Sequence, residues 1–545
     1  MTRYCEECGS RLSPGTRFCE NCGSPVEGAA SVSEEGGPSP ADLCDDPAWP
    51  ERLKAAQLGG RVREVGILYT HSTRLRDRLG VGTEKLLEEI EGYLATSYRA
   101  GILYFYFDLA RNAFASLDSM EIADHVALLG RLRDRMRMAG TDPRFLLILG
   151  GDDVVPMGVL PNQSRDPDEA VESDLPFATL STASPWEGSS ASLVGDMLVG
   201  RIPTARAMNH GSGRIGSGGS ESAPLQNSLF AYFESRKAAV AAWPGWGEPA
   251  GLAAAVWEES SRSVFAQLGG GDLLLSPETA LDNLRGRFDF RSRLLYFNVH
   301  GSERTPFWYG QAESGEDAGS EEYPRVFSPD EPPLLDKGYV LGTEACYGTD
   351  LRRASGGGDS ILLSALCHGC LAFVGSSRIA YGTTYAPPRL ADLVVLGFLK
   401  GMREGYYAGE ALREARKTLA ADRGLDDCTI KTLIEFSLFG DPALRLSPTE
   451  PATPIVPMPD IGVPTIDIRR AVAMELASVN DSISRAIEAF VRERHADFRA
   501  AKPIYYRMGN STYQAIFQLP EGSLGGVLKV YFDESGQIIK EYRSK

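Results

Sequence analysis

The sequence is poor in several features, and each scarcity argues against a class of protein. Its 545 residues contain no run of 18 or more apolar residues, so we expect no transmembrane helix and no membrane as a partner. Positive charge is in deficit, with 56 Lys and Arg against 73 Asp and Glu, which gives a net charge of −17. Because phosphate binding requires a surplus of Lys and Arg, a nucleic acid is not an expected partner either.

Secretory features are scarce as well. Residues 1–5 lead directly into a cysteine motif, without the apolar stretch of a standard signal peptide. The nine cysteines are an odd number, and four of them have the spacing of metal ligands. The others therefore do not predict a disulfide framework, and we expect a protein of the reducing cytoplasm.

Composition divides the chain into segments, and the length predicts about three to five structural units. A compact cysteine motif, residues 1–27, is followed by a linker at 28–48 that is rich in Gly, Ser, Pro and Glu. A second linker, residues 448–465, carries six prolines and should be extended. We expect the remaining units to be an N-terminal α/β subdomain at 49–225, a second α/β subdomain at 226–447, and a small α+β domain at 466–545 that can fold alone.

Short apolar segments alternate with helical patterns through the body of the chain. This alternation predicts a mostly parallel sheet with helices on both faces, an α/β/α sandwich. We expect strands at residues 62–70, 102–108, 145–150, 252–256, 294–299, 338–342 and 370–375, and helices at 83–95, 121–138, 360–366 and 391–400. In the C-terminal domain we expect a helix over 469–491 and strands at 504–508, 513–519, 526–532 and 537–542.

Two CxxC pairs near the start, Cys5 with Cys8 and Cys19 with Cys22, are separated by ten residues. A glycine follows each pair and lets the backbone turn so that its N–H groups face the thiolates. Four thiolates give Zn²⁺ a closed tetrahedral site, so we predict one structural zinc per chain. The segment is similar to the short zinc ribbons at the termini of many bacterial proteins, which usually hold protein partners. The alternative is four ordinary reduced cysteines.

His300 and Cys346 each stand just past the end of an expected strand, where open parallel sheets gather functional residues. The 46 residues that separate them are close to the spacing of about 50 in caspases. The letters EACYG around Cys346 resemble the caspase pattern Q-A-C-[RQG]-G, and depart from it at Glu344 and Tyr347. The two residues are therefore candidates for a catalytic His–Cys dyad.

The residue types suit acyl transfer. A thiol becomes a useful nucleophile when its pKa is lowered, and a nearby imidazole can lower it or protonate the leaving amine. The N–H groups of Gly301 and Cys346 are candidate donors to an oxyanion. We expect the side chains of His300 and Cys346 to face each other across a cleft open to solvent. The alternative is a satisfied histidine at a strand end and a small buried cysteine.

Six motifs in order resemble those of the gingipain-like cysteine peptidases of clan CD, over about residues 60–447. They are GGDDVVP at 150–156, SD at 173–174, GDMLVGRIP at 195–203, HG at 300–301, AC at 345–346 and FGDPAL at 439–444. The resemblance implies a caspase-like α/β/α catalytic subdomain preceded by a smaller α/β subdomain. It also implies a hydrolase that acts on protein or peptide substrates.

The same resemblance suggests residues for substrate specificity. Gingipain-like peptidases carry acidic residues in the segment that corresponds to Glu258 and Glu259, where one orients the histidine and another lines the specificity pocket. The sequence leaves the two roles open between these glutamates, and the alternative is a pair of solvated acids at a helix N-terminus. Ser376, Ser377 and Arg378 correspond to the substrate groove of the family, although Arg378 also fits a surface charge.

Some relatives bind Ca²⁺, for which the resemblance suggests Asp152, Asp153 and Asp174, although loop aspartates are also common turn formers. Taken together, the sequence predicts a regulated cytoplasmic cysteine endopeptidase of clan CD, with P1 Lys or Arg if Glu258 or Glu259 lines the pocket. The alternative function is a catalytically silent caspase-like scaffold, which recruits partners through the zinc ribbon and the C-terminal domain.

The zinc assignment makes a first prediction. The full chain should carry one Zn²⁺ by elemental analysis, and a form that starts at Asp46 should carry none. Because a closed zinc site does no chemistry, removal of the ribbon should leave peptide cleavage largely intact. Equal zinc in both forms would show that the metal is held elsewhere.

Overall fold

The computed structural model describes residues 3–4, 11–12, 62–111, 121–204, 228–312, 322–352, 359–421, 425–446, 474–508, 512–520 and 523–545. The four candidate zinc ligands and both predicted linkers lie outside these residues. Near the N-terminus the structure describes only a short antiparallel pair, β1 (Arg3–Tyr4) with β2 (Arg11–Leu12). Within the described part of the chain, no helix is long and apolar enough to cross a membrane.

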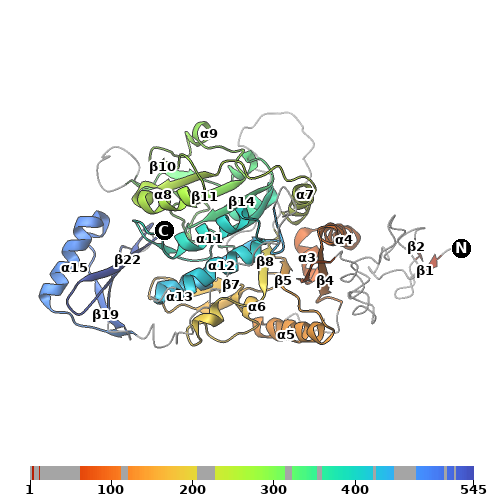
Figure 1. The fold of residues 1–545 in the computed structure, drawn as a ribbon, viewed down its shortest axis with the longest axis horizontal. Helices are drawn as coiled ribbons and strands as arrows, with labels where there is room; N and C mark the ends of the chain where they lie inside the picture. The colour runs from red at the N-terminus through yellow and green to blue at the C-terminus, as the bar shows by residue number, and fades with distance from the viewer. Residues whose placement is uncertain are drawn as a thin grey trace.

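A ten-stranded sheet forms the centre of the molecule (Figure 1). Its strand order is β10-β9-β11-β14-β15-β17-β8-β5-β3-β4. In chain order the strands are β3 (Glu64–Thr70), β4 (Ile102–Asp108), β5 (Phe145–Leu149), β8 (Leu198–Ile202), β9 (Ala250–Ala254), β10 (Leu274–Ser276), β11 (Leu294–Asn298), β14 (Tyr339–Thr343), β15 (Cys370–Ser376) and β17 (Phe436–Gly440).

The sheet is parallel except at one position. All neighbouring strands run in the same direction apart from β15 and β17, which pair antiparallel. Strand β17 belongs to the second half of the sequence, yet it pairs with β8 of the first half. The two predicted subdomains therefore share one continuous sheet.

Helices cover both faces, as the alternation of strands and helices predicted (Figure 1). On one side, α8 contacts α11, α11 contacts α12, and α12 contacts α13. On the other side, α7 contacts both α4 and α10. The helices of this body are α3 (Ser72–Leu79), α4 (Thr83–Arg99), α5 (Ile122–Met138), α6 (Leu175–Thr179), α7 (Ser228–Ala241), α8 (Glu258–Gln267), α9 (Leu284–Arg287), α10 (Ile361–Cys367), α11 (Ala391–Arg403), α12 (Ala408–Ala420) and α13 (Asp427–Glu435). The α/β sandwich expected from the sequence is confirmed.

A six-stranded antiparallel sheet joins the C-terminal domain to the body. Its order is β16-β22-β21-β20-β19-β18, and β16 (Tyr381–Gly382) belongs to the body. The other strands are β18 (Met474–Leu476), β19 (Ile504–Met508), β20 (Tyr513–Gln518), β21 (Val527–Phe532) and β22 (Ile538–Ser544). The remaining small strands are β6 (Gly158–Pro161) with β7 (Ala170–Ser173), and β12 (Trp308–Tyr309) with β13 (Arg325–Phe327).

The helix expected over 469–491 is wrong for residues 474–480, while residues 469–473 lie outside the described part of the chain. The described chain begins this region with strand β18, and the helix α15 covers Asp481–Arg494. The side chain of Asn480 accepts a hydrogen bond from the Ile483 N–H and so starts the helix there. The helical periodicity had been extended upstream of this capping residue.

A buried carboxylate ties the two halves of the sheet together. Asp441, directly after β17, is fully buried and lies 2.6 Å from the guanidinium of Arg236 in α7. The hydroxyls of Tyr93 and Tyr104 donate to the same carboxylate, and the Asp441 N–H donates to the hydroxyl of Tyr232 at 2.6 Å. Helices of both halves thus meet at one ion pair that has no access to water.

This cluster predicts a large effect on stability. Replacement of Asp441 by Ala leaves the buried Arg236 without its carboxylate, which should cost about 3–5 kcal/mol of the free energy of unfolding. As a control, Asp153 pairs with Arg78 at 3.0 Å with about half of its side chain exposed, so Asp153→Ala should cost less than about 1 kcal/mol. Urea unfolding of both variants tests this, and equal midpoints would contradict it.

Candidate active site

The two residues singled out by the sequence follow neighbouring strands. Strands β11 and β14 pair in parallel, so the loops that carry His300 and Cys346 leave the sheet at the same edge. Gly301 packs directly on the backbone of Cys346, because a Cβ at Gly301 would lie only 1.7 Å from the Cys346 carbonyl oxygen. A glycine is therefore required here, and the two loops are in contact.

The imidazole of His300 is fully enclosed. The ring packs against Trp257 at 4.4 Å and against Tyr323 at 5.5 Å between ring centroids. Its Nε2 lies 2.9 Å from Oε1 of Gln311, which also accepts a hydrogen bond from Arg543 at 2.9 Å. Since arginine can only donate, this oxygen is an acceptor, and Nε2 of His300 carries the proton.

This environment holds His300 neutral. Burial is the main cause, and the charge of Arg543 adds to it, so that the pKa of His300 falls to about 3. Nδ1 makes no hydrogen bond with any described residue. The backbone of Lys545 interacts with the ring and raises the pKa of His300, but by less than burial lowers it. The neutral ring therefore has an unprotonated Nδ1 that can accept a proton.

Cys346 is enclosed as well, with 4% of its surface exposed. The Ala380 N–H donates to its Sγ at 3.3 Å. Burial raises the pKa of the thiol far above its ordinary value, so Cys346 is a thiol and not a thiolate in this state. Among the described residues, His300 and Cys346 are both buried, so the open cleft expected from the sequence is not found there. Gly525 of the C-terminal domain packs against the imidazole of His300.

Space remains beside the cysteine between the body and the C-terminal domain. A cavity of about 570 Å³ is lined by Gly301, Cys346 and Arg378 of the body and by Gly525 and Lys545 of the C-terminal domain. A smaller cavity of about 230 Å³ reaches Cys346 from the side of residues 302–308. In the described part of the chain, the backbone N–H groups of Gly301 and Cys346 donate no hydrogen bond, so both remain available to an oxyanion.

An acidic pocket next to this cavity holds the ammonium of Lys545. Its Nζ lies 2.8 Å from Oδ1 of Asp392, 2.7 Å from Oε2 of Glu344 and 2.9 Å from Oδ1 of Asn298. The same Nζ stands 4.8 Å from the ring centroid of Trp257, which also contacts His300. No part of the Lys545 side chain reaches solvent, so this cation is paired entirely within the protein.

The pKa values of the two acids of the pocket shift in opposite directions. Burial, reinforced by the charge of Asp392, raises the pKa of Glu344 well above its ordinary value. Burial also acts on Asp392, but the ammonium of Lys545 and neighbouring hydrogen bonds outweigh it and lower the pKa of Asp392. Both acids raise the pKa of Lys545 against the effect of burial. The pocket therefore favours the ionised form of Asp392 over that of Glu344.

The glutamates suggested for specificity lie elsewhere. Glu258 forms an ion pair with Arg262 at 2.6 Å on the surface of α8, and Glu259 is exposed and accepts from the Ala386 N–H at 3.2 Å. Neither lines the two cavities that contain Cys346. The expected pocket acid is therefore wrong at both positions, because Glu258 and Glu259 lie at the surface of the first turn of α8.

The groove residues suggested by the resemblance form hydrogen bonds and an ion pair with other residues of the body. The Ser377 hydroxyl donates to the Glu172 carbonyl at 2.7 Å, and the Ser376 hydroxyl donates to the Arg378 carbonyl at 2.8 Å. The guanidinium of Arg378 is buried and forms an ion pair with Glu172, so it is not a surface charge. Arg378 lines the cavity of about 570 Å³ beside Cys346.

The aspartates considered for Ca²⁺ are occupied by groups of the protein. Asp152 accepts from the Met157 N–H at 2.7 Å, and Asp153 pairs with the guanidinium of Arg78. Asp174 pairs with the buried Arg201 at 2.6 Å. Each of the three aspartates therefore has a partner within the protein, and calcium binding there stays a prediction.

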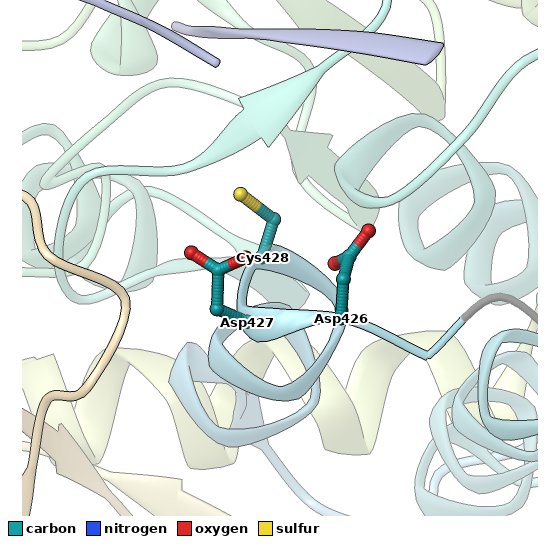
Figure 2. Close-up of side chains that lie close together, drawn as sticks. All are labelled: Asp426, Asp427 and Cys428. Carbon is teal, nitrogen blue, oxygen red and sulfur yellow. The ribbon is translucent and has the colours of Figure 1, made fainter. Parts of the chain in front are cut away.

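Asp426, Asp427 and Cys428 form a second acidic group, shown in Figure 2, with ligand atoms within 4.8 Å of one another. Lysines of the C-terminal domain neutralise it: Lys540 lies 2.6 Å from Asp426, and Lys529 lies 2.7 Å from Asp427. These ammonium groups stand where a cation would otherwise be expected. The cluster is therefore a contact between domains.

A zinc-ribbon domain family matches residues 4–26, the segment with the two CxxC pairs, which supports zinc binding there. No curated protein matches the chain.

Among solved structures, the chain is similar to the Arg specific cysteine proteinase gingipain R, at 13% identity and a TM-score of 0.44 over 89% of this chain and 91% of that chain. It is also similar to a structure titled "Structure of Protease", at 12% identity and 0.42 over the same shares. The Saccharomyces cerevisiae separase–securin complex matches at 12% identity and 0.29, over 72% of this chain and 24% of that one. Any function proposed for this chain rests on its own contacts.

The enclosed state of the cysteine predicts slow alkylation. Because Cys346 is a buried thiol and His300 stays neutral above about pH 4, iodoacetamide should label Cys346 at least about tenfold more slowly in the native protein than in urea. The native rate should show no inflection from the imidazole between about pH 5 and 8. Mass spectrometry of the Cys346 peptide measures both, and equal rates in native and unfolded protein would contradict the enclosure.

Proposed function

We propose that this protein is a cysteine endopeptidase that uses His300 and Cys346 to cleave proteins after a basic residue, in the first place lysine. The carrying observation is the position of Lys545, whose ammonium fills an acidic pocket while its backbone N–H donates to the Ala380 carbonyl at 2.9 Å. The N–H of the same Ala380 donates to Sγ of Cys346. The backbone of a lysine and the thiol of the nucleophile therefore both bind to the same residue, Ala380.

The proposed reaction is acyl transfer to the thiol. Nδ1 of His300 takes the proton of Cys346, and Sγ attacks the carbonyl carbon after the P1 lysine. The N–H groups of Gly301 and Cys346 stabilise the oxyanion of the tetrahedral intermediate. The imidazolium then gives its proton to the leaving amine, which leaves an acyl-enzyme. Water hydrolyses the thioester, and the thiol and the neutral imidazole return.

Asp392 is the proposed determinant of specificity. The pocket lowers the pKa of Asp392 and raises that of Glu344 beside it, so Asp392 is the acid that is more readily ionised. A buried carboxylate without a cation is costly, so an uncharged P1 side chain would leave Asp392 unpaired. Asn298 adds an oxygen acceptor, and Trp257 adds an aromatic face for the ammonium. These contacts support an endopeptidase over the catalytically silent scaffold.

Two further proposals come from the sequence. The zinc ribbon is proposed to hold a protein partner and to take no part in the chemistry, since four thiolates leave zinc no open position. The cysteine usage supports a cytoplasmic setting.

Specificity is tested with fluorogenic peptides of P1 Lys, Arg and Leu on a form that lacks residues 543–545, so that Lys545 does not compete. Asp392→Asn should lower kcat/KM for P1 Lys about 10- to 150-fold, from about 1.5–3 kcal/mol for a charged hydrogen bond, and should hardly alter the low rate for P1 Leu. Glu344→Gln should lose less, because the pKa of Glu344 is raised and Gln keeps the shape of the side chain.

The Cys346→Ala variant is the control for the chemistry itself. It should lose all hydrolysis of the P1 Lys peptide while its thermal unfolding midpoint stays close to that of the parent. Hydrolysis that survives Cys346→Ala would contradict the proposed mechanism. An Asp392→Asn variant that loses activity equally for all three peptides would instead contradict the assigned pocket.

A further inference from the structure

The end of the C-terminal domain enters the candidate active site as an added β-strand. Strand β22 pairs antiparallel with β16 of the body, with Ser544 opposite Tyr381 and Arg543 opposite Gly382. The pairing continues through the hydrogen bond from the Lys545 N–H to the Ala380 carbonyl. Extended peptides commonly bind by adding a strand to an exposed edge, with side-chain pockets for selectivity. Residues 543–545 have this geometry.

The neighbours of this tripeptide are parts of the proposed machinery. Lys545 fills the pocket of Asp392 and Glu344, and Arg543 donates to Gln311, the partner of His300 Nε2. Gly525 of the same domain closes over the imidazole so tightly that a Cβ there would lie 2.6 Å from Cε1 of His300. The domain therefore covers the histidine, fills the pocket and lines the cavity beside Cys346.

Further ion pairs fix the domain in this position. Lys529 of β21 pairs with Asp427 in the first turn of α13. Lys540 of β22 pairs with Asp426, the N-cap residue of the same helix. Lys529 and Asp427 are fully buried. Breaking a buried pair of this kind is strongly unfavourable, so the domain is held by more than the contact of Lys545.

We propose that residues 474–545 are a built-in inhibitory domain, whose residues 543–545 occupy the substrate groove with Lys545 in the P1 pocket. The proposal rests on the proposed function and adds its regulation: hydrolysis requires that this segment leave the groove. A tethered occupant acts at an effective concentration of about millimolar, so free substrates compete poorly with it. Displacement or removal of residues 543–545 switches the enzyme on.

The first test measures hydrolysis of a P1 Lys peptide well below millimolar concentration. Removal of residues 543–545, and separately Lys545→Ala, should raise kcat/KM about tenfold or more over the full chain. Lys502→Ala is the matched control, because Lys502 belongs to the same domain with 86% of its side chain exposed, and it should leave the rate unchanged. The full chain and its three altered forms could instead hydrolyse the peptide at equal rates, with hydrolysis lost on Cys346→Ala. That result would overturn the proposed inhibition, and the proposed peptidase activity would stand.

The second test needs no catalysis. In the Cys346→Ala background, fluorescence polarisation with the labelled peptide Glu-Tyr-Arg-Ser-Lys should give a Kd at least about tenfold lower for the form without residues 543–545 than for the full chain. A peptide with Glu in place of the final Lys should bind neither form. Equal Kd values for the two forms would overturn the occupied groove. Tighter binding of the peptide by the form without residues 543–545, together with no hydrolysis by any variant, would support the occupied groove and overturn the proposed peptidase activity.

Discussion

The ammonium of Lys545 is the charge on which the arrangement of the site depends. A fully buried cation must be paired, and Lys545 finds its partners on two separate segments of the body. Glu344 stands two residues before Cys346, and Asp392 lies in the first turn of α11. One side chain of the C-terminal domain thus connects the loop of the proposed nucleophile with a helix on one face of the sheet.

The large sheet supplies the rigid frame for this contact. Because β11 and β14 are parallel neighbours, His300 and Cys346 leave the sheet at the same edge, and Gly301 lets their loops touch. The antiparallel pair β15 and β17 joins the two parallel halves, and Asp441 then anchors β17 to α7. Motifs that resemble a peptidase family, such as those around Asp174 and Asp441, hold buried ion pairs. Their place in the molecule is structural.

The sequence predicted local features well and contacts between distant segments poorly. Strands such as β4 and β11 were found within about one residue at their ends, since short apolar runs between polar residues are a strong signal. The partnership of β16 with β22 could not be predicted, because the pairing of strands far apart in sequence leaves no periodicity. The glutamates were misplaced for a similar reason: the pocket acids come from separate segments, and only family position pointed to Glu258 and Glu259. Glu344 was visible as a departure from the caspase pattern, which was the one available signal.

The covering domain holds His300 in its resting state, while burial within the protein sets the state of Cys346. Burial is the first cause of both shifts, in opposite directions, because it lowers the pKa of the histidine and raises the pKa of the thiol. Arg543, the second cause at His300, belongs to the covering segment itself. Departure of that segment would admit water to the imidazole and remove a positive charge, so the pKa of His300 would rise. A higher pKa of the imidazole favours proton transfer from the thiol of Cys346. The segment that fills the pocket therefore also holds His300 in its uncharged form, and the same displacement that opens the groove prepares the base.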